Sequence, residues 1–166
     1  MRRRCENESF RAELHESACG RDGPERCPCG LGIEQAPEKI VADSSLISIV
    51  DDDGPLRESM RRLLRSLGYT VEVFPSAADF LASPHLGETA CLIADVHMPG
   101  MNGDDLYRSV VNRGRTIPTI LITAYPDDDV RDRALKDGVV CYLHKPIDKG
   151  QLVDCIRLSL SPRGNS

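Results

Sequence analysis

The stretch "LISIVDDDGPLRES", residues 46–59, places three consecutive aspartates directly behind an apolar run. A short apolar run is typical of a strand that is buried on both faces, whereas carboxylates favour water. Pro55 suits the first turn of a helix, and the leucines beyond it fall on one helical stripe. The stretch therefore predicts a strand at 46–50, an acidic turn at 51–53 and a helix after the turn.

The same alternation of short apolar runs and helical segments continues to about residue 160. Further strands are predicted at 70–74, 90–95, 118–123 and 139–143, with helices between them and after the last. Strands joined by helices run parallel, and their crossovers are right-handed. We therefore expect a doubly wound α/β domain, with a five-stranded parallel sheet and helices on both faces. The alternating pattern of residues 70–74 indicates an edge strand.

Acidic, hydroxyl and basic residues stand where the predicted strands end. They are Asp51, Asp52 and Asp53 after the first strand, Asp95 on the third, Thr123 on the fourth and Lys145 beyond the fifth. Sheets of this kind bind ligands at the carboxyl ends of their strands. Clustered carboxylates repel one another, and Mg²⁺ with its preference for oxygen ligands would relieve the conflict. A lysine and a hydroxyl nearby would donate to a phosphoryl group.

Composition and charge restrict the classes of function. The net charge is −5 and there is no long block of like charge, so we expect no nucleic-acid surface. No apolar stretch approaches the length of a membrane span. The N-terminus "MRRRCENESF" has no apolar segment behind its basic residues and so does not resemble a secretory signal. A cytoplasmic protein with reduced thiols is predicted.

Residues 1–44 differ from the rest because they are rich in Gly, Pro, Cys and charge. They are predicted to form a disordered N-terminal extension, or an over-extended reading frame. Cys19, Cys27 and Cys29 lack the paired spacing of a structural zinc site. The predicted domain covers residues 45–160, followed by a tail at 161–166, and we expect it to stand alone.

Four motifs stand in order on consecutive strand ends: "IVDDD", "LIADVHMPGMNG", "LITAY" and "LHKPID". Through them residues 45–160 resemble the receiver domain of response regulators, the phosphorylatable half of two-component signalling. Receivers of the nitrogen-fixation regulator type also have a stretch similar to "SAADFL". The resemblance implies a flavodoxin-like (βα)5 fold with the strand order 2-1-3-4-5.

The resemblance also implies a phosphorylation site. Asp95 would be the phosphoacceptor, supplied by a sensor histidine kinase or a phosphotransfer protein. Asp51, Asp52, Asp95 and the backbone carbonyl of His97 would bind Mg²⁺. The chain would not be an enzyme, but an acceptor that assists its own phosphoryl transfer and dephosphorylation.

Further residues would report the phosphorylated state. Lys145 would pair with one phosphoryl oxygen and Thr123 with another, and Pro146 would follow a cis peptide bond. Thr123 and the aromatic Tyr142 would form the switch. The surface of the helix at 127–138, the last strand and the final helix would bind an unknown protein target or form a homodimer. The side chains of His97 and His144 are expected to be exposed and without a ligand role, although that of His97, with Tyr125, flanks Asp95 and Thr123 and should tune the access of water.

Three alternatives are open at this stage. Asp51 and Asp53 form the D-x-D pattern of aspartate-nucleophile phosphatases, although Pro55 stands where such enzymes have Thr or Val. The chain could instead be a phosphate sink or carrier in a relay. It could also be a receiver that has lost phosphorylation and serves as a scaffold, which the intact set of site residues argues against.

Overall fold

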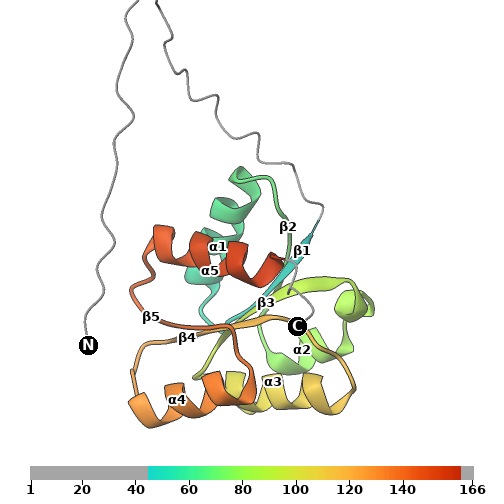
Figure 1. The fold of residues 1–166 in the computed structure, drawn as a ribbon. Coiled ribbons are helices and arrows are strands. Elements are labelled where there is room, and N and C mark those ends of the chain that lie inside the picture. The colour runs from blue at the N-terminus through green and yellow to red at the C-terminus, as the bar shows by residue number, and fades with distance from the viewer. Residues whose placement is uncertain (1–44, 162–166) are drawn as a thin grey trace, which may run out of the picture. The chain divides into compact units, whose positions relative to one another are not determined.

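The computed structural model describes residues 45–161, which are built around a five-stranded parallel sheet in the order β2-β1-β3-β4-β5 (Figure 1). The strands are β1 (Leu46–Val50), β2 (Thr70–Phe74), β3 (Thr89–Asp95), β4 (Thr119–Thr123) and β5 (Cys141–His144). The helices are α1 (Gly54–Ser66), α2 (Ala77–Ala82), the 3-10 helix η1 (Pro84–Gly87), α3 (Gly103–Asn112), α4 (Asp128–Asp137) and α5 (Lys149–Leu160). The predicted fold and strand order are confirmed. The predictions for residues 1–44, and for the tail from 162, lie outside the described residues.

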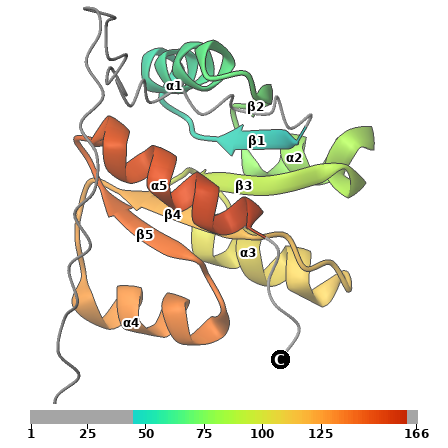
Figure 2. The same ribbon diagram turned by 45° about the horizontal axis from the view of Figure 1, so that its top comes forward.

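Helices cover both faces of the sheet, α1 and α5 on one and α2, α3 and α4 on the other (Figures 1 and 2). Each face has its own apolar cluster because side chains alternate along a strand. Ile47 and Ile49 of β1 pack with Leu64 of α1 and Ile156 of α5. Val50 belongs to the cluster beneath the other three helices. All five residues of β1 are buried, as expected for a central strand.

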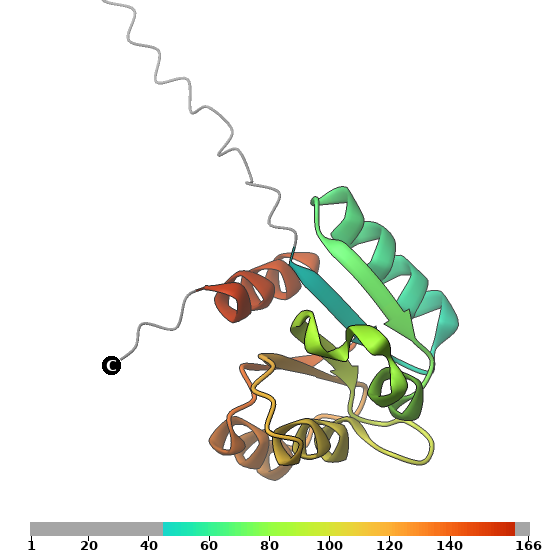
Figure 3. The same cartoon turned by 90° about the vertical axis from the view of Figure 1, so that its right-hand side faces the viewer.

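The edge position predicted for residues 70–74 is confirmed, since β2 borders only β1 and lies beside α1 (Figure 3). At the opposite edge, β5 begins at Cys141, two residues later than predicted. The reason is that the Val139 amide donates to the Ala134 carbonyl and so belongs to the turn that ends α4. The helix η1 was not predicted.

Strand register determines which residues meet at the carboxyl edge of the sheet. Val50 pairs with Ala94, so Asp51 and Asp95 each follow one member of this pair. Asp95 in turn pairs with Ile122, the residue before Thr123. Three neighbouring strands thus deliver two acids and a hydroxyl to one edge. Among residues 45–161, no helix is long and apolar enough to cross a lipid bilayer.

Candidate functional site

Three aspartates form a cluster at the carboxyl edge of the sheet. One carboxylate oxygen from each of Asp51, Asp52 and Asp95 lies within 4.8 Å of the other two. The first and third are buried, at 1% and 6% exposure, whereas Asp52 is exposed. The cluster therefore has a dry floor and one acid that faces solvent.

Lys145, in the segment after β5, is the cation of this cluster. Its Nζ atom lies 2.5 Å from Asp95 Oδ2 and 3.1 Å from Asp51 Oδ2. Its backbone amide donates to the Thr123 carbonyl at 2.7 Å, which joins this segment to the end of β4. The peptide bond between Lys145 and Pro146 is cis. The lysine thus joins residues that lie 94 and 50 positions away in the chain.

The titration of the cluster reflects competition between burial and pairing. Burial raises the pKa of Asp51, and the Asp53 amide and Lys145 offset only part of that rise. For Lys145, burial by itself would lower the pKa, but the hydrogen bonds and charges of Asp95 and Asp51 outweigh it and raise the pKa. The lysine is therefore charged at neutral pH. Its single positive charge does not balance the three carboxylates of the cluster.

Backbone groups hold the two buried acids in place. The Asp53 amide donates to Asp51 Oδ1 at 2.8 Å, and the His97 amide donates to Asp95 Oδ1 at 3.0 Å. Gly103 at the start of α3 packs so closely that a Cβ atom there would meet the Asp95 carbonyl oxygen. The His97 amide and Lys145 therefore hold the two oxygens of the Asp95 carboxylate, and Gly103 packs against the main chain of the same residue.

The third aspartate of the run has a different task. Asp53 is the N-cap of α1, with Oδ1 accepting from the Leu56 amide at 3.0 Å. It does not belong to the carboxylate cluster. This arrangement argues against the D-x-D phosphatase pattern, because the second acid of that pattern would have to face the reaction centre.

The donor set fits a hard divalent cation. Three carboxylates converge, two of them are buried, and the single lysine between Asp51 and Asp95 leaves the cluster with excess negative charge. Oxygen ligands of this kind, completed by water and a phosphoryl oxygen, match the preference of Mg²⁺. The metal role of the His97 carbonyl stays a prediction.

A second group of contacts surrounds Thr123, which is fully buried. Its Oγ1 atom lies 3.1 Å from His97 Nδ1 and 3.0 Å from the Tyr125 carbonyl oxygen, and it accepts from the Tyr125 amide at 3.1 Å. The rings of His97 and Tyr125 meet edge to face, with centroids 5.5 Å apart. His97 is exposed as expected, but the contact of its side chain with Thr123 was not predicted.

Tyr142 of β5 packs against the cluster beneath α2, α3 and α4. Its hydroxyl is buried and has no hydrogen-bond partner within residues 45–161. Burial raises the pKa of this phenol, and the Thr123 hydroxyl, which is close to it but outside hydrogen-bonding geometry, offsets part of the rise. The aromatic side chain therefore points inward, towards the Thr123 side of the site.

A cavity of about 600 Å³ opens beside the acids, between the loop after β3 and α4. Asp52 and His97 line one side of it, and Val130 and Arg133 of α4 line the other. Of the clustered acids, Asp52 is the one that faces this space.

The fold and this edge together define a receiver domain of two-component signalling. The sequence profile of the response regulator receiver domain matches residues 47–157. The chain belongs to this family, as the four strand-end motifs predicted.

Two curated relatives illustrate the similarity. The response regulator protein TodT of Pseudomonas putida is 36% identical over 145 residues, which are 86% of this chain and 62% of that protein. The transcriptional regulatory protein FixJ of Azorhizobium caulinodans is 34% identical over 118 residues, which are 71% of this chain and 56% of that protein. The chain thus covers less than two thirds of the length of either relative.

Solved structures agree with the fold. The crystal structure of FixJ-N is 30% identical, with a TM-score of 0.63, and the match covers 70% of this chain and 93% of that one. The response regulator StyR is 38% identical, with a TM-score of 0.66, and the match covers 70% of this chain and 59% of that one. The flavodoxin-like topology predicted from the resemblance is thereby confirmed.

Sequence reasoning placed Asp51, Asp52, Asp95 and Lys145 at one edge, and the structure brings these four together. It did not predict the contact of the His97 imidazole with Thr123, although this residue stands two positions after an acid on a strand end. The spacing alone did not show that the ring would turn towards the next strand.

Proposed function

We propose that Asp95 accepts a phosphoryl group from a phosphohistidine on a sensor histidine kinase or a phosphotransfer protein. One observation carries this proposal. The Asp95 carboxylate is buried beside the carboxylates of Asp51 and Asp52, and Lys145 donates a hydrogen bond to one of its oxygens. A buried carboxylate with a cation beside it is suited to attack phosphorus, because the lysine neutralises charge that develops on the phosphoryl oxygens.

The cofactor of this reaction would be Mg²⁺, held by Asp51, Asp52, Asp95 and the backbone carbonyl of His97. When bound, the ion supplies positive charge between the acceptor and the incoming phosphoryl group. The excess of carboxylates over cations in the cluster supports this assignment.

The transfer forms one bond and breaks another. An oxygen of Asp95 attacks phosphorus, the P–N bond to the donor imidazole breaks, and that nitrogen retains the electron pair. Lys145 then exchanges its contact with the free carboxylate for one with a phosphoryl oxygen. The Thr123 hydroxyl then donates a hydrogen bond to another phosphoryl oxygen.

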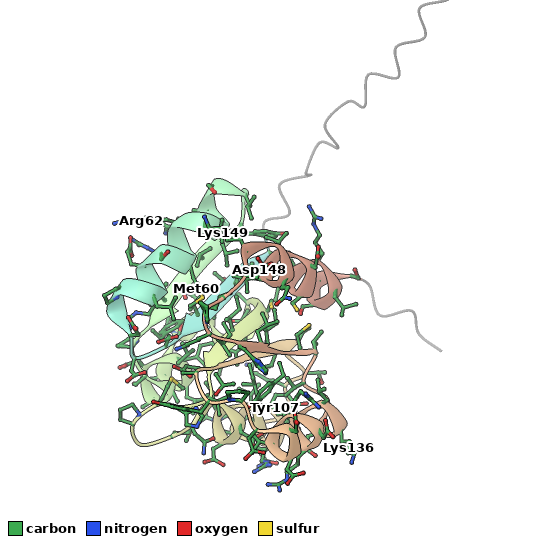
Figure 4. All side chains as sticks on the ribbon, turned by 90° about the vertical axis from the view of Figure 1, so that its left-hand side faces the viewer. Met60, Arg62, Tyr107, Lys136, Asp148 and Lys149 are labelled. Atoms are coloured by element: carbon green, nitrogen blue, oxygen red, sulfur yellow. The ribbon has the colours of Figure 1, made fainter. Side chains whose placement is uncertain are left out.

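The donor would dock in the groove between α1 and α5. This groove, about 580 Å³ in volume, has an apolar floor that includes Met60 and Leu152, and Lys145 forms part of its wall. Arg62 and Lys149 lie at the same end of the molecule as Met60 (Figure 4). Lys145, which contacts Asp95, lines this groove, so an amphipathic helix with acidic residues beside its donor histidine would match it in shape and charge.

The response would be read at the surface of α4, β5 and α5, in the cytoplasm, by a protein target or a second copy of the chain. Leu135 on α4 and Leu158 on α5 are exposed at 42% and 60%. These two side chains would add apolar contact area to that surface. Thr123 and Tyr142 would connect this surface to the site through a population shift between two states.

Labelling with acetyl phosphate tests the acceptor. The wild-type chain is expected to gain one phosphoryl group when Mg²⁺ is present and none when the metal is chelated, as measured by intact mass. Asp95→Asn should incorporate none. Peptide mapping that places phosphate on Asp51 would favour the phosphatase, and a wild-type chain that never gains phosphate would favour the scaffold.

A further inference from the structure

The hydroxyl of Thr123 is fully engaged before any phosphoryl group is present. It accepts from the Tyr125 amide, and it lies within hydrogen-bonding distance of both the Tyr125 carbonyl oxygen and His97 Nδ1. A threonine hydroxyl has a single proton. That proton is donated either to the carbonyl or to the imidazole, so it is not available to a third acceptor.

The two partners of this hydroxyl differ in kind. The contacts with Tyr125 are local, between residues two positions apart, and form a turn at the end of β4. The contact with His97 spans 26 positions and joins the loop after β3 to the loop after β4. Among these three hydrogen bonds, the one with His97 is the contact that holds the Thr123 side chain against a different segment of the site.

We propose that the His97 side chain is a positioning residue that holds Thr123 in the unphosphorylated state through the Nδ1–Oγ1 hydrogen bond. The inference rests on the proposed function and deepens it. In the tautomer whose Nδ1 accepts the Thr123 proton, this bond must break before Thr123 can donate to a phosphoryl oxygen. The unphosphorylated arrangement is therefore stabilised by a contact that the phosphorylated arrangement lacks.

The ring of Tyr125 supports this role. It packs edge to face against the imidazole and is itself 72% exposed. An aromatic side chain so exposed gains little from burial, and its contact restricts the His97 ring to the orientation that reaches Thr123. Both rings belong to segments that enter helices, so their positions are set by the fold.

The expected change in affinity for a phosphoryl mimic follows from the free energy that a neutral hydrogen bond contributes. A typical bond contributes about 0.5–1.5 kcal/mol net, which corresponds to a factor of about 2–10 in an equilibrium constant. Removing the His97–Thr123 bond should therefore strengthen the binding of a phosphoryl mimic by that factor.

Beryllofluoride, with Mg²⁺, is the probe, and its dissociation constant is measured by calorimetry. His97→Phe retains a ring against Tyr125 but removes the bond, and should bind the mimic about 2–10-fold more tightly than wild type. His97→Asn restores a polar atom near the place of Nδ1 and should bring the affinity back towards wild type. Weaker or unchanged binding by His97→Phe would overturn the proposal.

A double-mutant cycle with Thr123→Val separates this role from shielding of the site by the ring. Without the hydroxyl, replacement of His97 by Phe should leave the affinity for beryllofluoride as it is in Thr123→Val alone. A gain that persists in the double variant would show that the ring acts independently of Thr123. A wild-type chain that binds no beryllofluoride, or binds it equally well as Asp95→Asn, would overturn the proposed function together with this inference.

Discussion

The site has two sides that are built from different interactions. The acid side consists of Asp51, Asp52, Asp95 and Lys145; the hydroxyl side consists of Thr123, His97, Tyr125 and Tyr142. On the acid side, Lys145 joins two carboxylates that are almost fully buried. On the hydroxyl side, neutral hydrogen bonds and ring contacts connect buried and exposed groups.

This difference indicates a division of labour. Buried charges are costly to leave without a partner, so the acid side is rigid and retains a cation at all times. Neutral hydrogen bonds exchange at low cost, so the hydroxyl side can adopt a second arrangement. We infer that the acid side binds the metal and the phosphoryl group, and that the hydroxyl side responds.

The largest effect is expected from removal of the cation on the acid side. Lys145→Met leaves two buried carboxylates without their common partner, so the free energy of unfolding should fall by about 3 kcal/mol when divalent metal is chelated. Added Mg²⁺ should recover more of this loss than it adds to wild type, because the ion replaces the missing charge. Urea unfolding with and without Mg²⁺ measures both quantities.

Lys149→Met is the matched control, since Lys149 is exposed at the start of α5. Its unfolding free energy should stay within about 0.5 kcal/mol of wild type. If Lys145→Met behaved like this control, the acid side would not depend on its lysine.

A smaller effect is expected where α3 supports the acid side. Gly103→Ala brings a methyl group against the Asp95 carbonyl and Leu121, so stability should fall by about 2 kcal/mol. Phosphorylation by acetyl phosphate should also slow, because the acceptor strand is displaced. In Gly54→Ala the nearest atom is the flexible Arg57 guanidinium at 3.7 Å, and neither quantity should change appreciably.

The smallest effect is expected on the hydroxyl side and has the opposite sign. Tyr142→Phe removes a buried hydroxyl that has no hydrogen-bond partner within residues 45–161, so stability should rise by about 1 kcal/mol. Tyr125→Phe, at a position that is 72% exposed, should leave stability unchanged. A loss in Tyr142→Phe, seen by urea unfolding, would mean that the phenol has a partner in solution and does not point inward unpaired.

The sequence was sufficient for the fold and for the acid side. Apolar runs set the strands, and the rule that sites form at the carboxyl ends of parallel strands brought Asp51, Asp95 and Lys145 together. These positions depend on the main chain, whose path is determined by the buried faces of β1 and β3. The hydrophobic periodicity and the residues at the strand ends were therefore enough to predict these positions.

The hydroxyl side was harder to predict because it depends on side-chain torsions. The Tyr125 ring and the Thr123 hydroxyl determine the orientation of the exposed His97 imidazole. The hydrophobic pattern of the sequence carries no information about this orientation. The separate task of Asp53, which caps α1, could likewise not be told from its place in the run of three acids. The start of β5 was misplaced because apolar Val139 continues the turn after α4.

The main-chain hydrogen bond from the Lys145 amide to the Thr123 carbonyl, 2.7 Å long, crosses the boundary between the two sides. It connects the main chain of Lys145, which carries the ammonium group, directly to that of Thr123, which carries the hydroxyl. A shift of either residue is therefore expected to displace the other. We expect that a movement of Lys145 towards a bound phosphoryl group would also move the end of β4, and that phosphorylation would in this way be coupled to the part of the site where Tyr125 and Tyr142 lie.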